Sequence, residues 1–150
     1  MAGLARRGQG GTRPRSQYVI GADTSVIVRY LVGSPAGEAR RAARLIDDDS
    51  QEVAISVVAL AECTHVLRTQ YDVDQRTIID TLIELVQRVN VRVLGVRSDL
   101  LVGMLVRARG LAGRPIPDAM IVAATVEANA LPLATFDQDQ RRYGIATRAP

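Results

Sequence analysis

The sequence predicts an α/β fold, with a parallel β-sheet flanked by helices in a single domain at residues 18–150. The chain has 150 residues, 47% of them apolar, and a chain of this size can bury roughly two-thirds of its unfolded surface without a disulfide or structural metal. Short apolar, β-branched runs alternate with longer segments whose apolar residues recur at helical spacing. This alternation is typical of a parallel sheet covered by helices on both faces. We find no internal repeat and no second domain boundary.

The short apolar runs are the predicted strands. The first ends at Asp23, where the sequence passes into a helical pattern. Three further runs share its length and apolar character, and a weaker one lies near the C-terminus. The predicted strands are 18–22, 53–56, 91–96, 131–136 and, as the weakest candidate, 144–147.

Helix start and stop residues bound the segments between these strands. Gly33-Ser34-Pro35 ends the first helix, Asp74 is expected to cap the fourth, and Gly110 ends the fifth. The predicted helices cover 26–32, 36–46, 57–71, 75–89, 98–109 and 118–130.

The residue types that the chain lacks exclude several classes of site. Cys63 is the only cysteine and His65 the only histidine, so neither an intramolecular disulfide nor a His/Cys zinc site can form. All 19 basic residues are arginine. The lack of lysine argues against Walker-A phosphate binding, pyridoxal Schiff bases, protein kinases and phosphoacceptor receiver domains. Because the chain has only one cysteine and one histidine, any metal ion must be held mainly by oxygen ligands.

The net charge of +3 comes from the N-terminal tail. Residues 1–17 carry four arginines and no acid, whereas residues 18–150 carry 15 arginines and 16 acids. Because the tail is rich in glycine and poor in apolar residues, we expect a basic, disordered extension, with a phosphate-attracting arm as the alternative. The sequence shows neither a secretory signal nor an uncharged run of membrane-spanning length, which predicts a cytoplasmic protein.

Glu62 lies where a helix is expected to be apolar. Its neighbours one turn away are Val58 and Val66, so the carboxylate would interrupt an apolar stripe. A buried carboxylate is costly unless it is protonated, paired or bound to a cation. A salt bridge with His65 and a functional role are both open interpretations. Most other acids have a simpler interpretation; those at 47–49, for example, are expected to form a solvated loop.

Three further acids end or begin predicted elements. Asp23 and Asp137 each end a short apolar strand, and in one parallel sheet both would lie at the carboxyl edge, where open α/β sheets place ligands. Asp118 begins a nearly all-apolar helix that must be buried and could deliver its carboxylate to the same cleft. Each has a simpler alternative, namely a helix N-cap for Asp23 and Asp118 and a turn for Asp137.

Four carboxylates in one place favour a divalent cation, because repulsion would otherwise keep some of them protonated at neutral pH. Oxygen-only ligands are typical of Mg²⁺ or Mn²⁺, and such sites commonly act on phosphates. Hydrolysis of a phosphodiester is therefore the leading chemistry. Five arginines are candidates to flank the cleft and hold phosphates: Arg29, Arg68, Arg107, Arg109 and Arg114.

Four segments, in order, resemble the PIN-domain family and, within it, the VapC-type toxins of bacterial toxin–antitoxin modules. They are the strand leading into Asp23-Thr24-Ser25, SVVALAE ending at Glu62, PIPDAMIVAAT around Asp118, and Thr135-Phe136-Asp137-Gln138-Asp139. The resemblance covers 18 to about 147 at the spacing usual for the family. The tail at 1–17 is left out of it.

The resemblance implies an endoribonuclease that depends on Mg²⁺ or Mn²⁺. Its catalytic and metal-binding acids would be Asp23, Glu62, Asp118 and Asp137. Asp23 and Asp118 would be the main direct ligands, and the other two would hold metal-bound waters or a second ion. The supporting residues would be Ser25, Thr135 and Asp139. The resemblance also implies a homodimer silenced by a cognate VapB-type antitoxin that covers the acidic cleft.

Two other interpretations stay open. One is a PIN-fold nuclease that acts in RNA processing or on DNA without a toxin role. A compact single domain favours the toxin, because processing enzymes commonly carry additional RNA-binding modules. The other is a catalytically inactive PIN-fold interaction module, against which the retention of four acids argues.

Overall fold

A parallel sheet of three strands forms the centre of the structure, a computed structural model that describes residues 18–150. The strands are β1 (Val19–Ala22), β2 (Glu52–Ser56) and β3 (Val91–Leu94), in the order β1-β2-β3. Val53 of the central strand lies opposite Ile20 on one side and Val91 on the other. The predicted α/β fold with a parallel sheet is confirmed. The basic extension expected at 1–17 lies outside the described residues.

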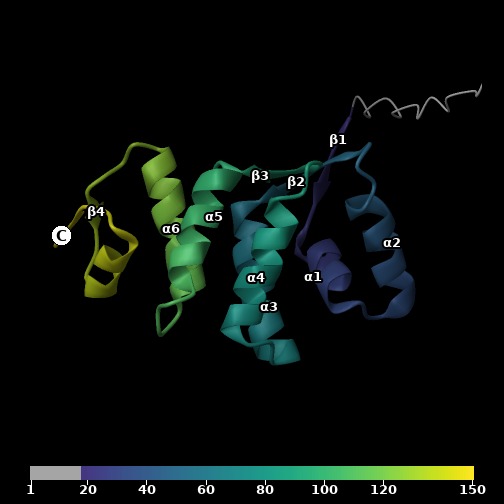
Figure 1. Cartoon of the computed structure of the whole chain (residues 1–150), viewed down its shortest axis with the longest axis horizontal. Coiled ribbons are helices and arrows are strands. Elements are labelled where there is room, and N and C mark those ends of the chain that lie inside the picture. Colours follow the sequence, from purple (N-terminus) through teal and green to yellow (C-terminus); the bar gives the residue numbers. More distant parts are fainter. Residues whose placement is uncertain (1–17) are drawn as a thin grey trace, which may run out of the picture.

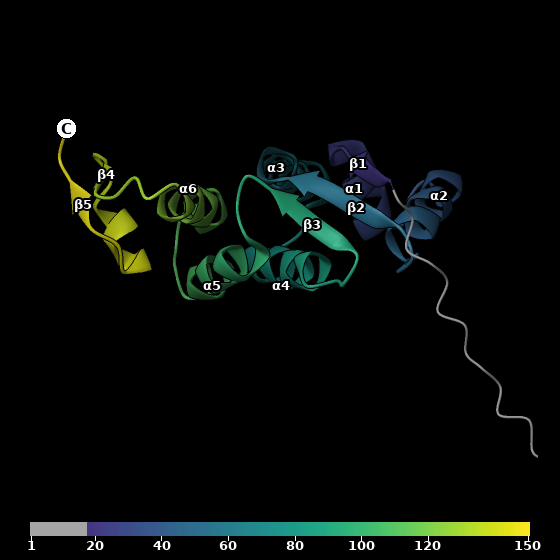
Figure 2. The same cartoon turned by 90° about the horizontal axis from the view of Figure 1, so that it is seen from above.

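Six helices surround this sheet and extend beyond it (Figure 1). They are α1 (Thr24–Val32), α2 (Ala36–Ile46), α3 (Val57–Tyr71), α4 (Gln75–Val86), α5 (Ser98–Ala108) and α6 (Pro115–Glu127). Seen from above, α1 and α3 lie on one side of the sheet and α4 on the other (Figure 2). Between these layers the central strand is buried along most of its length, which explains its uninterrupted apolar run at Val53, Ala54 and Ile55.

Some helix boundaries differ by a few residues from the predicted ones. Helix α4 ends at Val86 rather than at residue 89, and α6 begins at Pro115 rather than at Asp118. A proline suits the first turn of a helix, because its missing N–H would have no intrahelical partner there. Asp118 therefore lies within the first turn of α6 and is not its N-cap.

The C-terminal segment forms a second, separate sheet. β4 (Leu133–Ala134) pairs in parallel with β5 (Thr147–Arg148), and the 3-10 helix η1 (Gln138–Tyr143) connects them. This small sheet lies beyond α6, on the side away from β1 (Figure 2). The expectation that the strand at 131–136 joins the sheet of β1 is therefore wrong.

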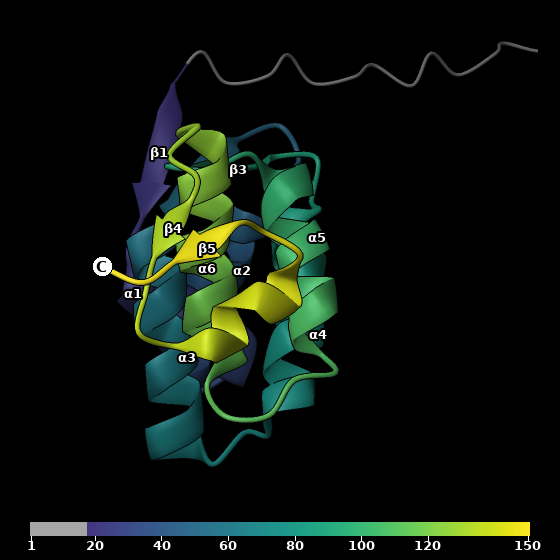
Figure 3. The same ribbon diagram turned by 90° about the vertical axis from the view of Figure 1, so that its left-hand side faces the viewer.

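The packing of η1 explains this correction. Tyr143 is buried, and its hydroxyl donates a hydrogen bond to the carbonyl of Pro115 at the start of α6. Figure 3 shows η1 in front of α6, and residues of the two elements are in contact. Gly144 then reverses the chain in the left-handed region, with a φ of 73°. Because η1 is fixed against α6, the nearest edge for the two-residue β4 is β5.

Among residues 18–150, no helix is long and apolar enough to cross a membrane.

Candidate functional site

Asp23 connects the end of β1 to the start of α1. Its Oδ1 accepts hydrogen bonds from the Val26 backbone N–H at 3.1 Å and from the Ser25 hydroxyl at 2.7 Å. These bonds, that of Ser25 above all, lower the pKa of Asp23. Asp23 is thus an exposed helix N-cap that stays ionised at neutral pH, and Ser25 supports it directly.

Glu62 lies next to this cap, on α3. The hydroxyl of Thr24 donates a hydrogen bond to Glu62 Oε2 at 2.5 Å, which links the start of α1 to α3. Contrary to the expectation, Glu62 is exposed, and Val58 one turn away is 72% exposed. This part of α3 therefore faces solvent. The structure shows no ion pair between Glu62 and His65, and the bonded partner, Thr24, was missed although it adjoins Asp23.

Cys63, beside Glu62, is not a competing catalytic group. Its side chain is fully buried, and this burial raises the pKa of the thiol to about 12. A thiol with such a pKa is a poor nucleophile at neutral pH. The candidate catalytic groups of this region are therefore its carboxylates.

Asp118 belongs to a second group of acids. Partial burial raises the pKa of Asp118, and the charges of Asp137 and Asp139 add to this effect, whereas a hydrogen bond from Gln140 opposes it. All three carboxylates line one cavity of about 320 Å³ at the start of α6. Arg114 and Arg142 line the same cavity, and Arg142 pairs with Asp139.

Local turn geometry positions Asp137. Its Oδ1 accepts a hydrogen bond from the Asp139 N–H at 2.8 Å and caps η1, as the simpler alternative for this acid describes. The Thr135 hydroxyl in turn accepts a hydrogen bond from the Asp137 N–H at 2.9 Å. Next to them Gln140 is buried, and its Oε1 has no partner in the structure. Nothing in the sequence pattern singled out Gln140.

The predicted acids thus fall into two groups. Asp23 and Glu62 lie near the end of β1, whereas Asp118, in the first turn of α6, lines a cavity with Asp137 and Asp139. Within the part of the chain that the structure describes, no group of three or more His, Cys, Asp or Glu is placed to hold a metal ion. The oxygen donors suit Mg²⁺ or Mn²⁺ in kind, but their placement does not form one metal site. The pairing of β4 with β5 rather than with β1 accounts for the position of Asp137, which follows β4.

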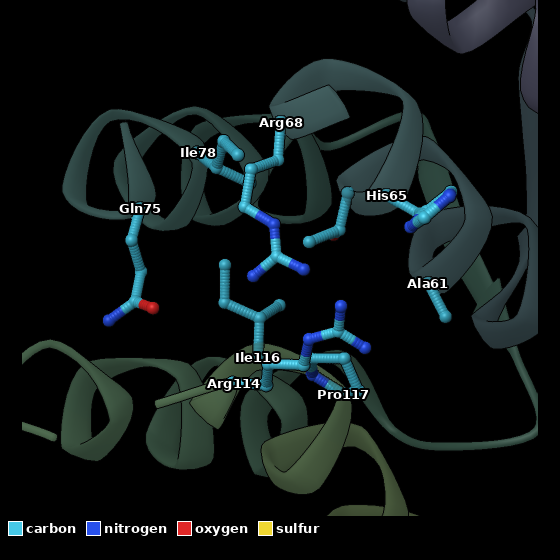
Figure 4. Close-up of a pocket in the computed structure, with 9 residues that line it drawn as sticks. Ala61, His65, Arg68, Gln75, Ile78, Arg114, Ile116 and Pro117 are labelled. Carbon is cyan, nitrogen blue, oxygen red and sulfur yellow. The ribbon is translucent and has the colours of Figure 1, made fainter. Parts of the chain in front are cut away.

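Three of the five candidate arginines already have partners. Arg29 pairs with Glu38, Arg109 pairs with Asp80, and Arg107 donates a hydrogen bond to the carbonyl of Tyr143. The two others, Arg68 and Arg114, form no ion pair or side-chain hydrogen bond with any described residue. Both line a cavity between α3 and α6 (Figure 4).

The comparisons with known proteins agree with the fold. The family model of the PIN domain matches residues 21–146. No curated protein and no solved structure matches the chain. Because the match spans most of its length, the chain belongs to the PIN domain family.

Proposed function

We propose that this chain is an endoribonuclease that depends on Mg²⁺ or Mn²⁺ and hydrolyses RNA phosphodiester bonds. PIN domains are typically nucleases and typically use divalent metals. The observation that carries the proposal is the cavity lined by Asp118, Asp137 and Asp139. Repulsion among these acids contributes to the raised pKa of Asp118, and a bound cation would remove that repulsion.

The proposed active site uses both groups of acids. Asp23 and Asp118 are the proposed direct ligands, with Glu62 and Asp137 in support, as the family resemblance implies. Because the two groups lie apart, one ion can engage both only if α6 and the segment after it move relative to β1. The alternative within the same proposal is that each group acts on a separate ion.

Replacing single acids tests the catalytic assignment. Asp23→Asn and Asp118→Asn remove a charge while nearly preserving volume, so the fold should survive. We expect either change, or a chelator, to reduce cleavage of a susceptible RNA by about 100-fold or more, since even the loss of an outer-shell partner costs up to about that factor. The measurement is the initial cleavage rate on a labelled RNA with Mg²⁺ or Mn²⁺.

Asp48→Asn is the matched control for charge. Asp48 lies in an exposed turn, where its Oδ1 accepts hydrogen bonds from Ser50, and asparagine retains that acceptor. We expect parental activity from this variant. Folded Asp23→Asn and Asp118→Asn variants that cut as fast as Asp48→Asn would contradict the assignment.

The finer proposal is that this nuclease is the toxin of a VapBC-type module. It rests on the four ordered motifs around Asp23, Glu62, Asp118 and Asp137, which resemble VapC-type toxins. We expect a homodimer in the cytoplasm and a cognate antitoxin encoded by a small reading frame directly upstream. Induced expression of the chain should arrest growth, and co-expression of the upstream frame should restore it. If cells grow normally while they contain active nuclease, the toxin role is wrong, although the proposed nuclease activity is retained.

A second candidate is a PIN-fold interaction module without catalysis. The separation of the acids into two groups favours it, because no three of them are placed to hold an ion within residues 18–150. Under this interpretation the parental protein leaves RNA intact at every concentration of Mg²⁺ and Mn²⁺. The same cleavage assay therefore separates the two candidates.

A further inference from the structure

A cavity lies between α3 and α6, the two helices that carry Glu62 and Asp118. It holds about 60 Å³, several times the roughly 10–15 Å³ that a single water needs. Ala61 and His65 line it from α3, and Pro117 lines it from α6. In the sequence these residues adjoin or closely follow the two acids. The cavity therefore lies between the two groups of carboxylates without containing either.

Two guanidinium groups face each other across this cavity. Arg68 reaches in from the last turn of α3, and Arg114 reaches in from the residue before α6 (Figure 4). His65, the only histidine, lies at the same rim. No carboxylate of residues 18–150 lines this cavity, although Arg114 also lines the neighbouring cavity of Asp118, Asp137 and Asp139. Two like charges that face one space repel each other, and a shared anion would convert this repulsion into attraction.

The floor of the cavity is apolar. Ile78 is 1% exposed and Ile116 is 3% exposed, and both line the space below the arginines. Low-dielectric walls strengthen the attraction between a guanidinium and an anion compared with open water. They also offer a surface on which a ribose or a base can pack, which a free inorganic ion would not use. The cavity thus combines charge for a phosphate with an apolar surface for what is attached to it.

We propose that Arg68 and Arg114 bind a backbone phosphate of the RNA strand in this cavity. The inference rests on the proposed function and deepens it, because it names the residues that hold the substrate between the two groups of acids. A planar guanidinium donates two parallel hydrogen bonds to a phosphate, so two such groups hold one phosphate by its oxygens. The other three candidates, Arg29, Arg107 and Arg109, would first have to give up an ion pair or hydrogen bond within the protein.

Binding in the absence of cleavage tests the inference. The parental chain is titrated into a labelled single-stranded RNA with a chelator present, at several salt concentrations, and anisotropy gives Kd. We expect Arg68→Gln and Arg114→Gln each to weaken binding about 10-fold, the loss of one charge-assisted contact. Each change should also lower the slope of log Kd against log salt by about 0.7, the value for one phosphate contact on a single strand.

Arg40→Gln is the matched control. Arg40 is exposed on α2, outside the cavity and without an ion pair in the structure, and the substitution changes charge in the same way. It should change Kd by less than about twofold. Arg68→Lys and Arg114→Lys keep the charge and lose the paired hydrogen bonds, so they should weaken binding while retaining the parental salt slope.

Two outcomes would overturn the inference. One is binding by Arg68→Gln and Arg114→Gln that equals that of Arg40→Gln. The other is displacement of RNA by inorganic phosphate at equal phosphate concentration, which would make the cavity a site for a free anion. If RNA is cleaved while the arginine variants bind normally, the nuclease stands and the phosphate site is wrong. If the arginine variants lose binding but the parent never cleaves, the phosphate site stands and the nuclease is wrong.

Discussion

Asp23 and Asp118 have opposite electrostatic surroundings in the folded chain. Hydrogen bonds from Ser25 and Val26 favour the ionised form of Asp23 and lower its pKa. Burial and the charges of Asp137 and Asp139 disfavour the ionised form of Asp118 and raise its pKa. At neutral pH the first carboxylate therefore contributes stability, whereas the second costs stability. An unfavourable ionised group at a proposed active site is typical of groups kept for function rather than for folding.

Asp118→Asn should stabilise the protein at neutral pH. A raised folded-state pKa means that the folded chain binds the proton more tightly, so this carboxyl favours folding at low pH. That contribution is lost as the pH rises from the unfolded value near 3.8 through the folded value. The gain from the substitution should be no more than about 1 kcal/mol, because the carboxyl is partly exposed and its repulsions are screened. Thermal unfolding at pH 7 and at pH 3 measures it.

The stability difference between Asp118→Asn and the parent should shrink at pH 3, where the parental carboxyl is protonated. Asp23→Asn is the control, because asparagine is also a good N-cap and its pKa effect has the opposite sign, with stability lost as the pH falls. A lower melting temperature for Asp118→Asn than for Asp23→Asn at pH 7 would contradict this account.

At the scale of elements, the junction between β2 and α3 positions Glu62. Ser56 ends β2, and its hydroxyl accepts a hydrogen bond from the Ala59 N–H at 3.0 Å, which caps α3. One turn further on, Leu60 is fully buried and fixes the rotation of the helix. Glu62 is thereby held within reach of the Thr24 hydroxyl. The cap and the buried leucine together determine where this acid lies.

Ser56→Ala should remove about 1 kcal/mol from the free energy of unfolding, since it deletes the only side-chain cap of α3. Urea denaturation followed by circular dichroism measures it. Ser98→Ala is the matched control, because Ser98 begins α5 without a capping hydrogen bond and its loss should change the free energy by under about 0.5 kcal/mol. Equal effects of both substitutions would show that the cap does not stabilise α3.

The order of elements could be predicted from the sequence, because each is specified locally. The buried β2 reads as an apolar run, and Asp74 caps α4 as expected, by accepting a hydrogen bond from the Thr77 N–H. The partner of β4 could not be predicted, since a two-residue strand pairs wherever the packing of Tyr143 leads the chain. The exposure of Glu62 was missed for a similar reason. A helical pattern does not say which of its faces the neighbouring helices leave uncovered.

The proximity of Asp118 to Asp137 and Asp139 was expected from the four motifs, and the structure places these three acids around one cavity. The proximity of Asp137 to Asp23 was expected from a shared sheet, which the structure does not contain. Which arginines lie together could likewise not be predicted from the sequence. The sequence offered five candidates, and only the tertiary structure shows that Arg68 and Arg114 alone among them face a common cavity.

For the whole molecule, the excess of positive charge lies in a part of the sequence that contains none of the candidate site residues. The tail at 1–17 carries the excess of arginine, whereas residues 18–150 are close to neutral and hold all the acids. If the cavity arginines bind RNA, the tail is dispensable. Deletion of residues 1–17 should leave the rate of metal-dependent cleavage within about threefold of the parent, with only a smaller salt dependence of binding. Loss of activity with the tail would show that its charge binds the substrate.

The central claim is that acids in a PIN fold cut RNA with the help of a divalent metal. The most direct test incubates the parental chain and Asp118→Asn with total cellular RNA, with Mn²⁺ or with chelator, and maps the new RNA ends. The account predicts a discrete set of ends that requires both the metal and Asp118. The same ends in the Asp118→Asn sample, or in the presence of chelator, would contradict it.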